Sequence, residues 1–277
     1  MMMVERHSPL AKLWNTAIWA VMIFFLINVA LMIATVLIDS FATRWFATWL
    51  PPGATTRWYV FAWNEFQLPS VLLVTAEFVG AVVLLSGIFG VPAAYAMARR
   101  DFPGKNATML LFLLPLIVPP ITYGIPMATV LYKAGVGGHL SGVILANLVP
   151  SVPFVILVMI PFVQQIDPRI EDAAHIFGAR TFRLFVHVLL PLLAPGVLAA
   201  LLLVLVRTIG MFELSFFASG PGSQPIVVAL YYAVFAAGIR PNQSIDAMAV
   251  VYMVSTIVWL LAAFRFVNPI QVVARGK

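Results

Sequence analysis

Three ionisable side chains lie inside or beside long apolar runs: Glu77, Arg207 and Glu213. A charge at the centre of a bilayer costs at least about 2.5–3.5 kcal/mol, so each side chain needs a partner or an aqueous cavity. Arg207 and Glu213 would lie about 120° apart around a straight helix, so we do not expect them to pair with each other. Two interpretations stay open. Arg207 and Glu77 form an ion pair between helices, or the three line a translocation path, with carboxylates facing a cationic group and Arg207 an anionic one.

Residues for covalent or metal chemistry are scarce. The chain has no cysteine, which excludes thiol catalysis, disulfides and Cys-ligated metals. Its histidines lack metal-ligand spacing, and no Ser/His/Asp cluster, H-E-x-x-H motif or nucleotide-binding motif occurs. We therefore expect no catalytic residue, no metal and no cofactor, and any ATP must be bound by a partner subunit.

The composition identifies the solvent that surrounds these residues. The chain has 277 residues, of which 62% are apolar and 9% charged, against about 25% charged in a soluble domain. So few charges cannot cover a soluble fold, so most of the chain must lie in lipid. This composition excludes a soluble enzyme and a disordered protein. A nucleic-acid partner is excluded because the positive charges lie between the apolar runs.

Six apolar runs are long enough to cross about 30 Å of hydrocarbon, which takes about 20 residues. The third contains several prolines, which break main-chain hydrogen bonding. A further run, Pro225–Gly238, is too short to cross, so we expect it to be re-entrant or interfacial. The six expected spans are Leu13–Ile38, Ser70–Met97, Ala107–Tyr132, Ser141–Val163, Leu189–Met211 and Ile245–Phe264.

The distribution of positive charge predicts the orientation of these spans. With an even number of crossings, both termini lie on the same side of the membrane. If that side is the cytoplasm, it carries most of the 16 Lys and Arg residues, and the opposite side carries only Arg44, Arg57, Lys133 and Arg240. The positive-inside rule therefore predicts a multi-pass protein with cytoplasmic N- and C-termini.

The longest cytoplasmic loop has the signals of a short helix outside the membrane. Asp167 precedes Pro168, as a helix-capping residue does when proline takes the first helical position. Gly178 ends this helix, and a second helix can begin after Thr181. The first helix presents an apolar stripe, formed by Ile170, Ala173, Ala174 and Phe177. Such a stripe either rests on headgroups and neighbouring spans or lies in a groove of a partner.

Two sequence motifs resemble those of one known family. The loop contains Asp172-Ala173-Ala174, Gly178, Val188, Leu190 and Pro191, which resembles the E-A-A-x-x-x-G-x9-I-x-L-P loop of the membrane subunits of type I ABC importers. Asp172 replaces the usual glutamate, although Glu171 stands beside it, and Val188 replaces isoleucine. The second span ends in GVPAAYAMAR, residues 90–99, followed by Phe102-Pro103-Gly104-Lys105, similar to a stretch common in these permeases. The resemblance covers roughly residues 70–267.

The resemblance implies a permease subunit of a binding-protein-dependent importer in the bacterial inner membrane. Its fold would be all-α, with six transmembrane helices, a cytoplasmic coupling helix and the short segment between helices 5 and 6. Its partners would be a dimer of ATP-binding cassette subunits, a second permease subunit (identical or not), an extracytoplasmic substrate-binding protein and a small solute. Gly178 would allow a turn where a side chain would clash. By resemblance, the contact with the ATPase would involve Asp172, Ala173, Ala174, Phe177, Gly178, Leu190 and Pro191.

The expected organisation has three parts. Residues 1–69 form the N-terminal tail, first span and periplasmic loop, residues 70–267 the permease core with the loop 164–191, and residues 268–277 a cytoplasmic tail. The C-terminal half is most similar to the spermidine/putrescine branch, although iron, phosphonate and sugar branches share much of it. The main alternative is a secondary transporter or channel driven by an ion gradient, with Glu77 and Glu213 as its protonatable groups.

Overall fold

The computed structural model describes residues 9–235 and 240–266, and these residues form helices joined by loops, without strands. Five helical runs are long and apolar enough to cross a membrane, and a bent pair of helices could make a sixth crossing. This confirms the all-α membrane fold. The expected tail at 268–277 lies outside the described residues. The five runs are α1 (Pro9–Phe41), α3 (Leu68–Arg99), α6 (Leu140–Gln164), the series α8 (Thr181–Leu184), η1 (Phe185–Leu189) and α9 (Leu190–Ile209), and α12 (Asn242–Phe266).

Shorter helices connect these spans. The apolar segment expected at Pro225–Gly238 contains a ten-residue helix, too short to cross a bilayer, and the end of that segment lies outside the described residues. The shorter helices are α2 (Arg57–Glu65), α4 (Lys105–Ile117), α5 (Pro120–Lys133), α7 (Pro168–Ile176), α10 (Glu213–Ala218) and α11 (Ile226–Phe235).

The third expected span is the bent pair. Helices α4 and α5 meet at an angle of 102°. Between them, Val118 is extended with ψ 130° and Pro119 with ψ 133°. A residue before proline is pushed out of the helical region, and neither Pro119 nor Pro120 has an N–H to continue the helix. The consecutive prolines therefore turn one predicted crossing into two short helices.

The chain divides into two compact units, residues 1–64 with 237–251 and residues 65–236 with 252–277. In the first unit, the end of α1 is held by polar contacts. The Trp58 indole donates to the Ala42 carbonyl at 2.7 Å, and the Gln243 amide donates to the Asp39 carboxylate at 3.0 Å. All side chains of residues 12–33 are exposed, as expected for a helix whose solvent is lipid or another membrane chain.

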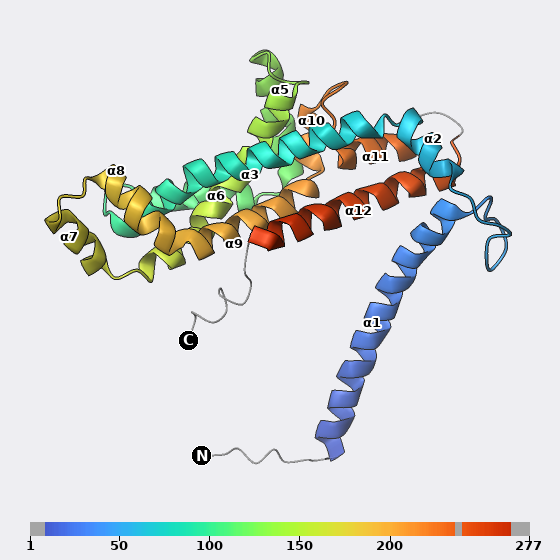
Figure 1. Ribbon diagram of the computed structural model, residues 1–277, viewed down its shortest axis with the longest axis horizontal. Helices are drawn as coiled ribbons and strands as arrows, with labels where there is room; N and C mark the ends of the chain where they lie inside the picture. Colours follow the sequence, from blue (N-terminus) through green and yellow to red (C-terminus); the bar gives the residue numbers. More distant parts are fainter. Residues whose placement is uncertain (1–8, 236–239, 267–277) are drawn as a thin grey trace. The chain divides into compact units, whose positions relative to one another are not determined.

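In the second unit, α3, α6 and α9 run side by side and form the core (Figure 1). Phe78, Ile156 and Leu193 are among its fully buried side chains. The α3 and α6 backbones approach so closely that a Cβ atom on Gly90 would lie 2.7 Å from Val155. Gly90 belongs to the second sequence motif, so this motif residue has a packing role that only glycine can fill.

Candidate functional site

The short helix predicted outside the spans is α7. The Asp167 side chain accepts a hydrogen bond from the Arg169 N–H at 2.9 Å, and Pro168 occupies the first turn. Gly178 ends the helix with φ +84°, and α8 begins at Thr181. The Ala179 N–H donates to the Ala174 carbonyl at 3.0 Å. The predicted helix, bend and second helix are therefore present.

The reason for the glycine in the bend differs from the expectation. A Cβ atom on Gly178 would meet nothing within 4 Å, so no neighbouring atom excludes a side chain. The left-handed φ is what disfavours other residues, because an L side chain there crowds its own backbone. The expected clash at Gly178 is therefore with the residue's own backbone and not with a neighbouring side chain among the described residues.

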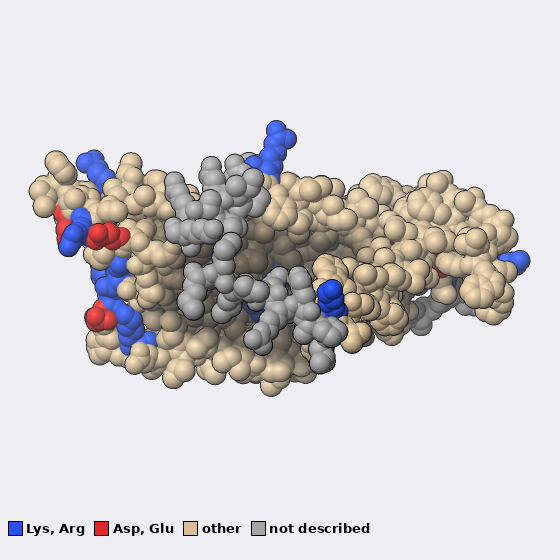
Figure 2. Space-filling model, turned by 90° about the horizontal axis from the view of Figure 1, so that it is seen from below, with Lys and Arg blue, Asp and Glu red and all other residues tan. Residues whose placement is uncertain are grey.

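The apolar stripe of α7 is divided between the protein and the solvent. Ala174 packs against the buried core, whereas Ala173 and Asp172 are exposed. Ile176 is 84% exposed and Phe177 91%. Figure 2 shows acidic and basic side chains gathered at the end of the molecule where α7 lies in Figure 1. This end therefore combines charge, suited to water, with large apolar side chains that no described residue covers.

Glu171 connects the two sequence motifs. Its Oε1 accepts from Nε of Arg99 at 2.7 Å, and its Oε2 accepts from the Tyr95 hydroxyl at 2.6 Å. The side chains of Arg99 and Glu171 are 15% and 12% exposed. The Arg99 guanidinium also donates to the Ile166 carbonyl, just before α7. We call Tyr95, Arg99 and Glu171 the Glu171 cluster.

The return into the membrane passes through a π-helical turn. The Leu190 N–H donates to the carbonyl of Phe185, five residues earlier. Pro191 follows, and because it has no N–H it cannot close the next regular bond. This places the predicted residues Leu190 and Pro191 at a local change of helix type, a feature found often at functional sites.

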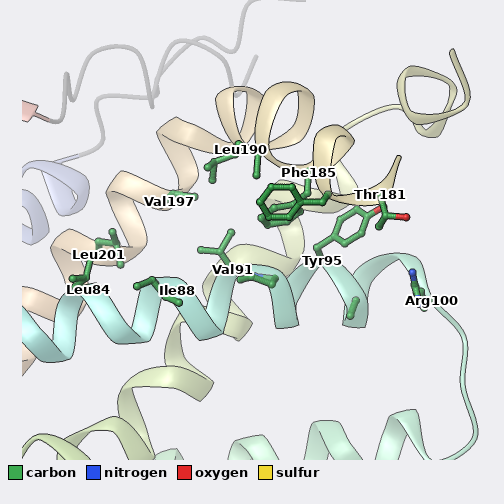
Figure 3. Close-up of a pocket in the computed structure, with 15 residues that line it drawn as sticks. Leu84, Ile88, Val91, Tyr95, Arg100, Thr181, Phe185, Leu190, Val197 and Leu201 are labelled. Atoms are coloured by element: carbon green, nitrogen blue, oxygen red, sulfur yellow. The ribbon is translucent and has the colours of Figure 1, made fainter. Parts of the chain in front are cut away.

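An apolar groove of about 880 Å³ lies between α3 and the series α8, η1 and α9. Figure 3 shows Leu84 toward one end of the groove and Arg100 and Thr181 toward the other. Tyr95 and Phe185 lie together in its wall, with ring centroids 5.8 Å apart in an edge-on arrangement. The groove therefore borders the Glu171 cluster through Tyr95, which lines the groove and donates to Glu171.

Within residues 9–235 and 240–266, none of the three charges in the spans forms a salt bridge, in contrast to Arg99 with Glu171 and Lys105 with Asp101. Of the two interpretations left open, the ion pair between Arg207 and Glu77 is therefore not formed in the described part of the chain. Glu77 is exposed on α3, and the guanidinium of Arg207 lies 5.4 Å from the ring centroid of Phe154.

Arg207 and Glu213 come closer to a common point. Both lie within electrostatic range of the Tyr123 hydroxyl, and both are partly buried. The Tyr123 hydroxyl of α5 therefore lies near two of the three predicted path residues, Arg207 of α9 and Glu213 of α10, whereas Glu77 is exposed on α3.

Comparison with known proteins identifies the family. A model of the family described as "Binding-protein-dependent transport system inner membrane component" matches residues 86–270. The chain belongs to this family. The match includes both sequence motifs and every residue of the Glu171 cluster.

Among curated relatives, a probable sulfate transport system permease protein of Chlorokybus atmophyticus is 34% identical over 154 residues, 51% of this chain and 53% of the relative. A molybdate/tungstate transport system permease protein of Thermococcus kodakarensis is 32% identical over 129 residues, 47% of this chain and 52% of the relative. The chain thus spans about half the length of these relatives. Neither is named for a polyamine, so the expected spermidine/putrescine branch finds no support in them.

One solved structure has a similar fold over almost the full length of this chain. A chain from a bacterial ABC transporter involved in the import of the polysaccharide alginate matches with a TM-score of 0.73 and 15% identity. The match covers 95% of this chain and 98% of that chain. At this identity, the likeness shows the fold.

One residue of the site, Glu171, was not among the site residues that the sequence motifs predicted. Asp172 occupies the motif position of the usual glutamate, but it is Glu171 that is bonded to the membrane helix. The signal was present in Tyr95 and Arg99, a hydroxyl and a guanidinium one helical turn apart in the other motif. Their partner is more than seventy positions away in sequence, so local spacing could not identify it.

Proposed function

We propose that this chain is the non-catalytic transmembrane subunit of an ABC importer in the bacterial inner membrane, with both termini in the cytoplasm. Its partners are a pair of ATP-hydrolysing subunits, a second permease subunit and an extracytoplasmic binding protein. Family membership supports the transport role. Asp172, Ala173, Ala174, Phe177 and Gly178 form or position the surface that contacts the ATPase.

The observation that carries this proposal is the exposed apolar end of α7. A nine-residue helix is too short to be stable in water alone. Ile176 and Phe177 are nonetheless left 84% and 91% exposed, beside charged residues that favour water over lipid. Covering one such side chain contributes roughly 1.5–3 kcal/mol. A cytoplasmic partner with an apolar cleft is the surface that suits this helix.

Co-purification tests the ATPase contact. We expect Phe177→Ser to reduce the amount of ATPase subunit that co-purifies with the chain by at least about tenfold, as for a central apolar contact of an interface. Phe46→Ser is the matched control, since Phe46 is 85% exposed and is predicted to lie on the opposite side of the membrane. Equal recovery of the ATPase with both variants would contradict the proposal.

For the solute we propose a small oxyanion such as sulfate or molybdate. Arg207 is a positive charge within the membrane that lies over the Phe154 ring and forms no salt bridge among the described residues, and a guanidinium suits an oxyanion. The names of the relatives agree with this chemistry. The carboxylate of Glu213 would line the translocation path without binding the anion.

Uptake of radiolabelled sulfate and molybdate, with labelled spermidine as comparison, tests the solute class. We expect uptake of one of the oxyanions, lost on ATP depletion and kept with an uncoupler when ATP is maintained. Arg207→Gln should abolish that uptake without loss of ATPase co-purification. Uptake of spermidine alone would exclude the oxyanion. Uptake that survives ATP depletion but stops with the uncoupler would instead indicate a transporter driven by an ion gradient.

A further inference from the structure

We propose that the Glu171 cluster transmits the movement of α7 to α3, so that the coupling helix and this membrane helix move as one rigid body during transport. The proposal rests on the proposed function, because it assumes an ATPase that displaces α7. It assigns positioning roles to Tyr95, Arg99 and Glu171, which the motif comparison alone does not do. It also separates two adjacent acidic residues, since Asp172 would face the ATPase and Glu171 the membrane helix.

The geometry of the cluster favours rigid transmission. Tyr95 and Arg99 lie four positions apart, on the same face of α3. Each occupies a different oxygen of the same carboxylate, at 2.6 and 2.7 Å. Two charge-assisted bonds to separate oxygens fix both the position and the rotation of that carboxylate. Arg99 in addition donates to the Ile166 carbonyl, so the chain entering α7 is held by the same guanidinium.

The cluster is also the main polar connection between α7 and the membrane helices. Other side-chain bonds of this region are local: Asp167 bonds to the N–H of Arg169, and His175 bonds to the carbonyl of Ala179. Over residues 9–235 and 240–266, the hydrogen bonds that join a side chain of α7 to a membrane helix are those of Glu171. Its side chain is 12% exposed, so water competes little for these bonds.

Helix α3 extends the connection to the far end of the unit. From Arg99 to Thr75 the helix covers about 36 Å at 1.5 Å per residue. There the buried Thr75 hydroxyl accepts a hydrogen bond from the Ile226 N–H, the first residue of α11, at 2.9 Å. Between these ends, Gly90 brings α3 into close contact with α6. A displacement of α7 can therefore reach the short apolar helix α11 through one continuous helix.

Pulsed electron paramagnetic resonance can test whether α7 and α3 move together. The chain has no native cysteine, so Leu84→Cys on α3 and Arg169→Cys on α7 give two unique labelling sites. The complex is purified with its own ATPase and measured without nucleotide and after trapping with ATP and vanadate. We expect the distance between the labels to be the same in both states. When the labelled chain also carries Glu171→Gln, the distance between the labels should change by more than about 2 Å on trapping, the scale of helix shifts at interfaces.

Coupling gives a second measurement. In proteoliposomes, Glu171→Gln and Arg99→Gln should lower the amount of solute moved per ATP hydrolysed by about tenfold, while the ATPase still co-purifies. Arg100→Gln is the matched control, because Arg100 adjoins Arg99 but forms no described salt bridge. The exchanged pair Arg99→Glu with Glu171→Arg should recover part of the loss, which a purely local defect would not allow.

The outcomes separate the two proposals. If no ATPase subunit co-purifies with the unmodified chain, the proposed function fails and this inference fails with it. If the ATPase co-purifies but the label distance changes on trapping in the doubly labelled chain that keeps Glu171, α7 and α3 do not move together and only the inference is overturned. The same conclusion follows if Glu171→Gln leaves both the distance and the coupling ratio unchanged.

Discussion

Charges at the α7 end of the second unit and charges within its spans are held in opposite ways. At the α7 end, both oxygens of Glu171 accept hydrogen bonds and the carboxylate is paired with Arg99. Within the spans, the guanidinium of Arg207 lies over the ring of Phe154 and Glu77 is exposed on α3, and neither forms an ion pair in the described part of the chain. The described residues pair the charge of Glu171, and they form no ion pair with Arg207 or Glu77.

The difference separates charges that stabilise the fold from charges that need a partner from outside the chain. A paired, hydrogen-bonded carboxylate fixes the geometry of the elements that it joins. An unpaired charge within a membrane is costly unless a partner subunit, water or a polar solute solvates it. We therefore expect substitutions in the Glu171 cluster to reduce stability, and neutralisation of Arg207 or Glu77 to reduce transport without reducing stability.

The largest loss of stability should follow Arg99→Glu. This change removes the partner of Glu171 and places a like charge beside it in a site where the two side chains are 15% and 12% exposed. Breaking such a pair costs about 3–5 kcal/mol. We expect the thermal unfolding temperature of the purified chain in detergent to fall strongly.

The second salt bridge of the described residues provides the control for that variant. Lys105 pairs with Asp101, whose side chain is 99% exposed, and exposed pairs contribute about 0–1 kcal/mol. Lys105→Glu should therefore leave the unfolding temperature nearly unchanged. Equal shifts for Arg99→Glu and Lys105→Glu would mean that the Glu171 cluster does not stabilise the chain.

Neutralising the unpaired charges should have the opposite sign. Each such charge within a bilayer costs about 2.5–3.5 kcal/mol when nothing solvates it. Glu77→Gln and Arg207→Gln should therefore leave the isolated chain, in nanodiscs, as stable as before or more stable, while uptake by the complete complex falls. Thermal unfolding and uptake, measured on the same preparations, test this. A lower unfolding temperature for either variant would show that its charge is part of the fold.

An intermediate effect should follow Gly178→Ala. Gly178 and Gly104 both have φ +84°, and a Cβ atom on either would meet nothing within 4 Å. Both substitutions therefore cost about 1–2 kcal/mol for the left-handed backbone. The similarity makes Gly104→Ala a matched control. Only Gly178→Ala should also reduce ATPase co-purification, because only that glycine orients α7, and equal recovery would place the ATPase contact elsewhere.

Features set by local sequence were predictable. Apolar length located the spans, and the order Asp167, Pro168 and Gly178 located α7 and its end. The prolines of the third span were recognised as an interruption, but its 102° bend depends on two consecutive prolines acting together. For α7 and for the bend, the physical origin is the conformational preference of one or two residues, which needs no knowledge of the rest of the fold.

Pairings between distant residues were not predictable. One of the two interpretations of the sequence paired Arg207 with Glu77, whereas the structure forms no salt bridge between these two and pairs Arg99 with Glu171. All four are ionisable residues near apolar runs, and sequence alone does not say which faces of the helices meet. Side-chain depth and helix rotation decide this, and both are set by packing contacts such as that of Gly90 with Val155.

The smallest effect should follow Tyr95→Phe, which removes one hydrogen bond from Glu171 and keeps the ring. The phenyl ring can still pack edge-on against Phe185, and Arg99 still neutralises the carboxylate. The expected loss is therefore one hydrogen bond, about 0.5–1.5 kcal/mol. Tyr123→Phe provides the comparison, since its hydroxyl lies 3.3 Å from the Pro115 carbonyl, a longer and weaker contact to a neutral acceptor. If the unfolding temperature falls more for Tyr123→Phe than for Tyr95→Phe, the bonded carboxylate is not the stronger anchor and the contrast between the two regions is lost.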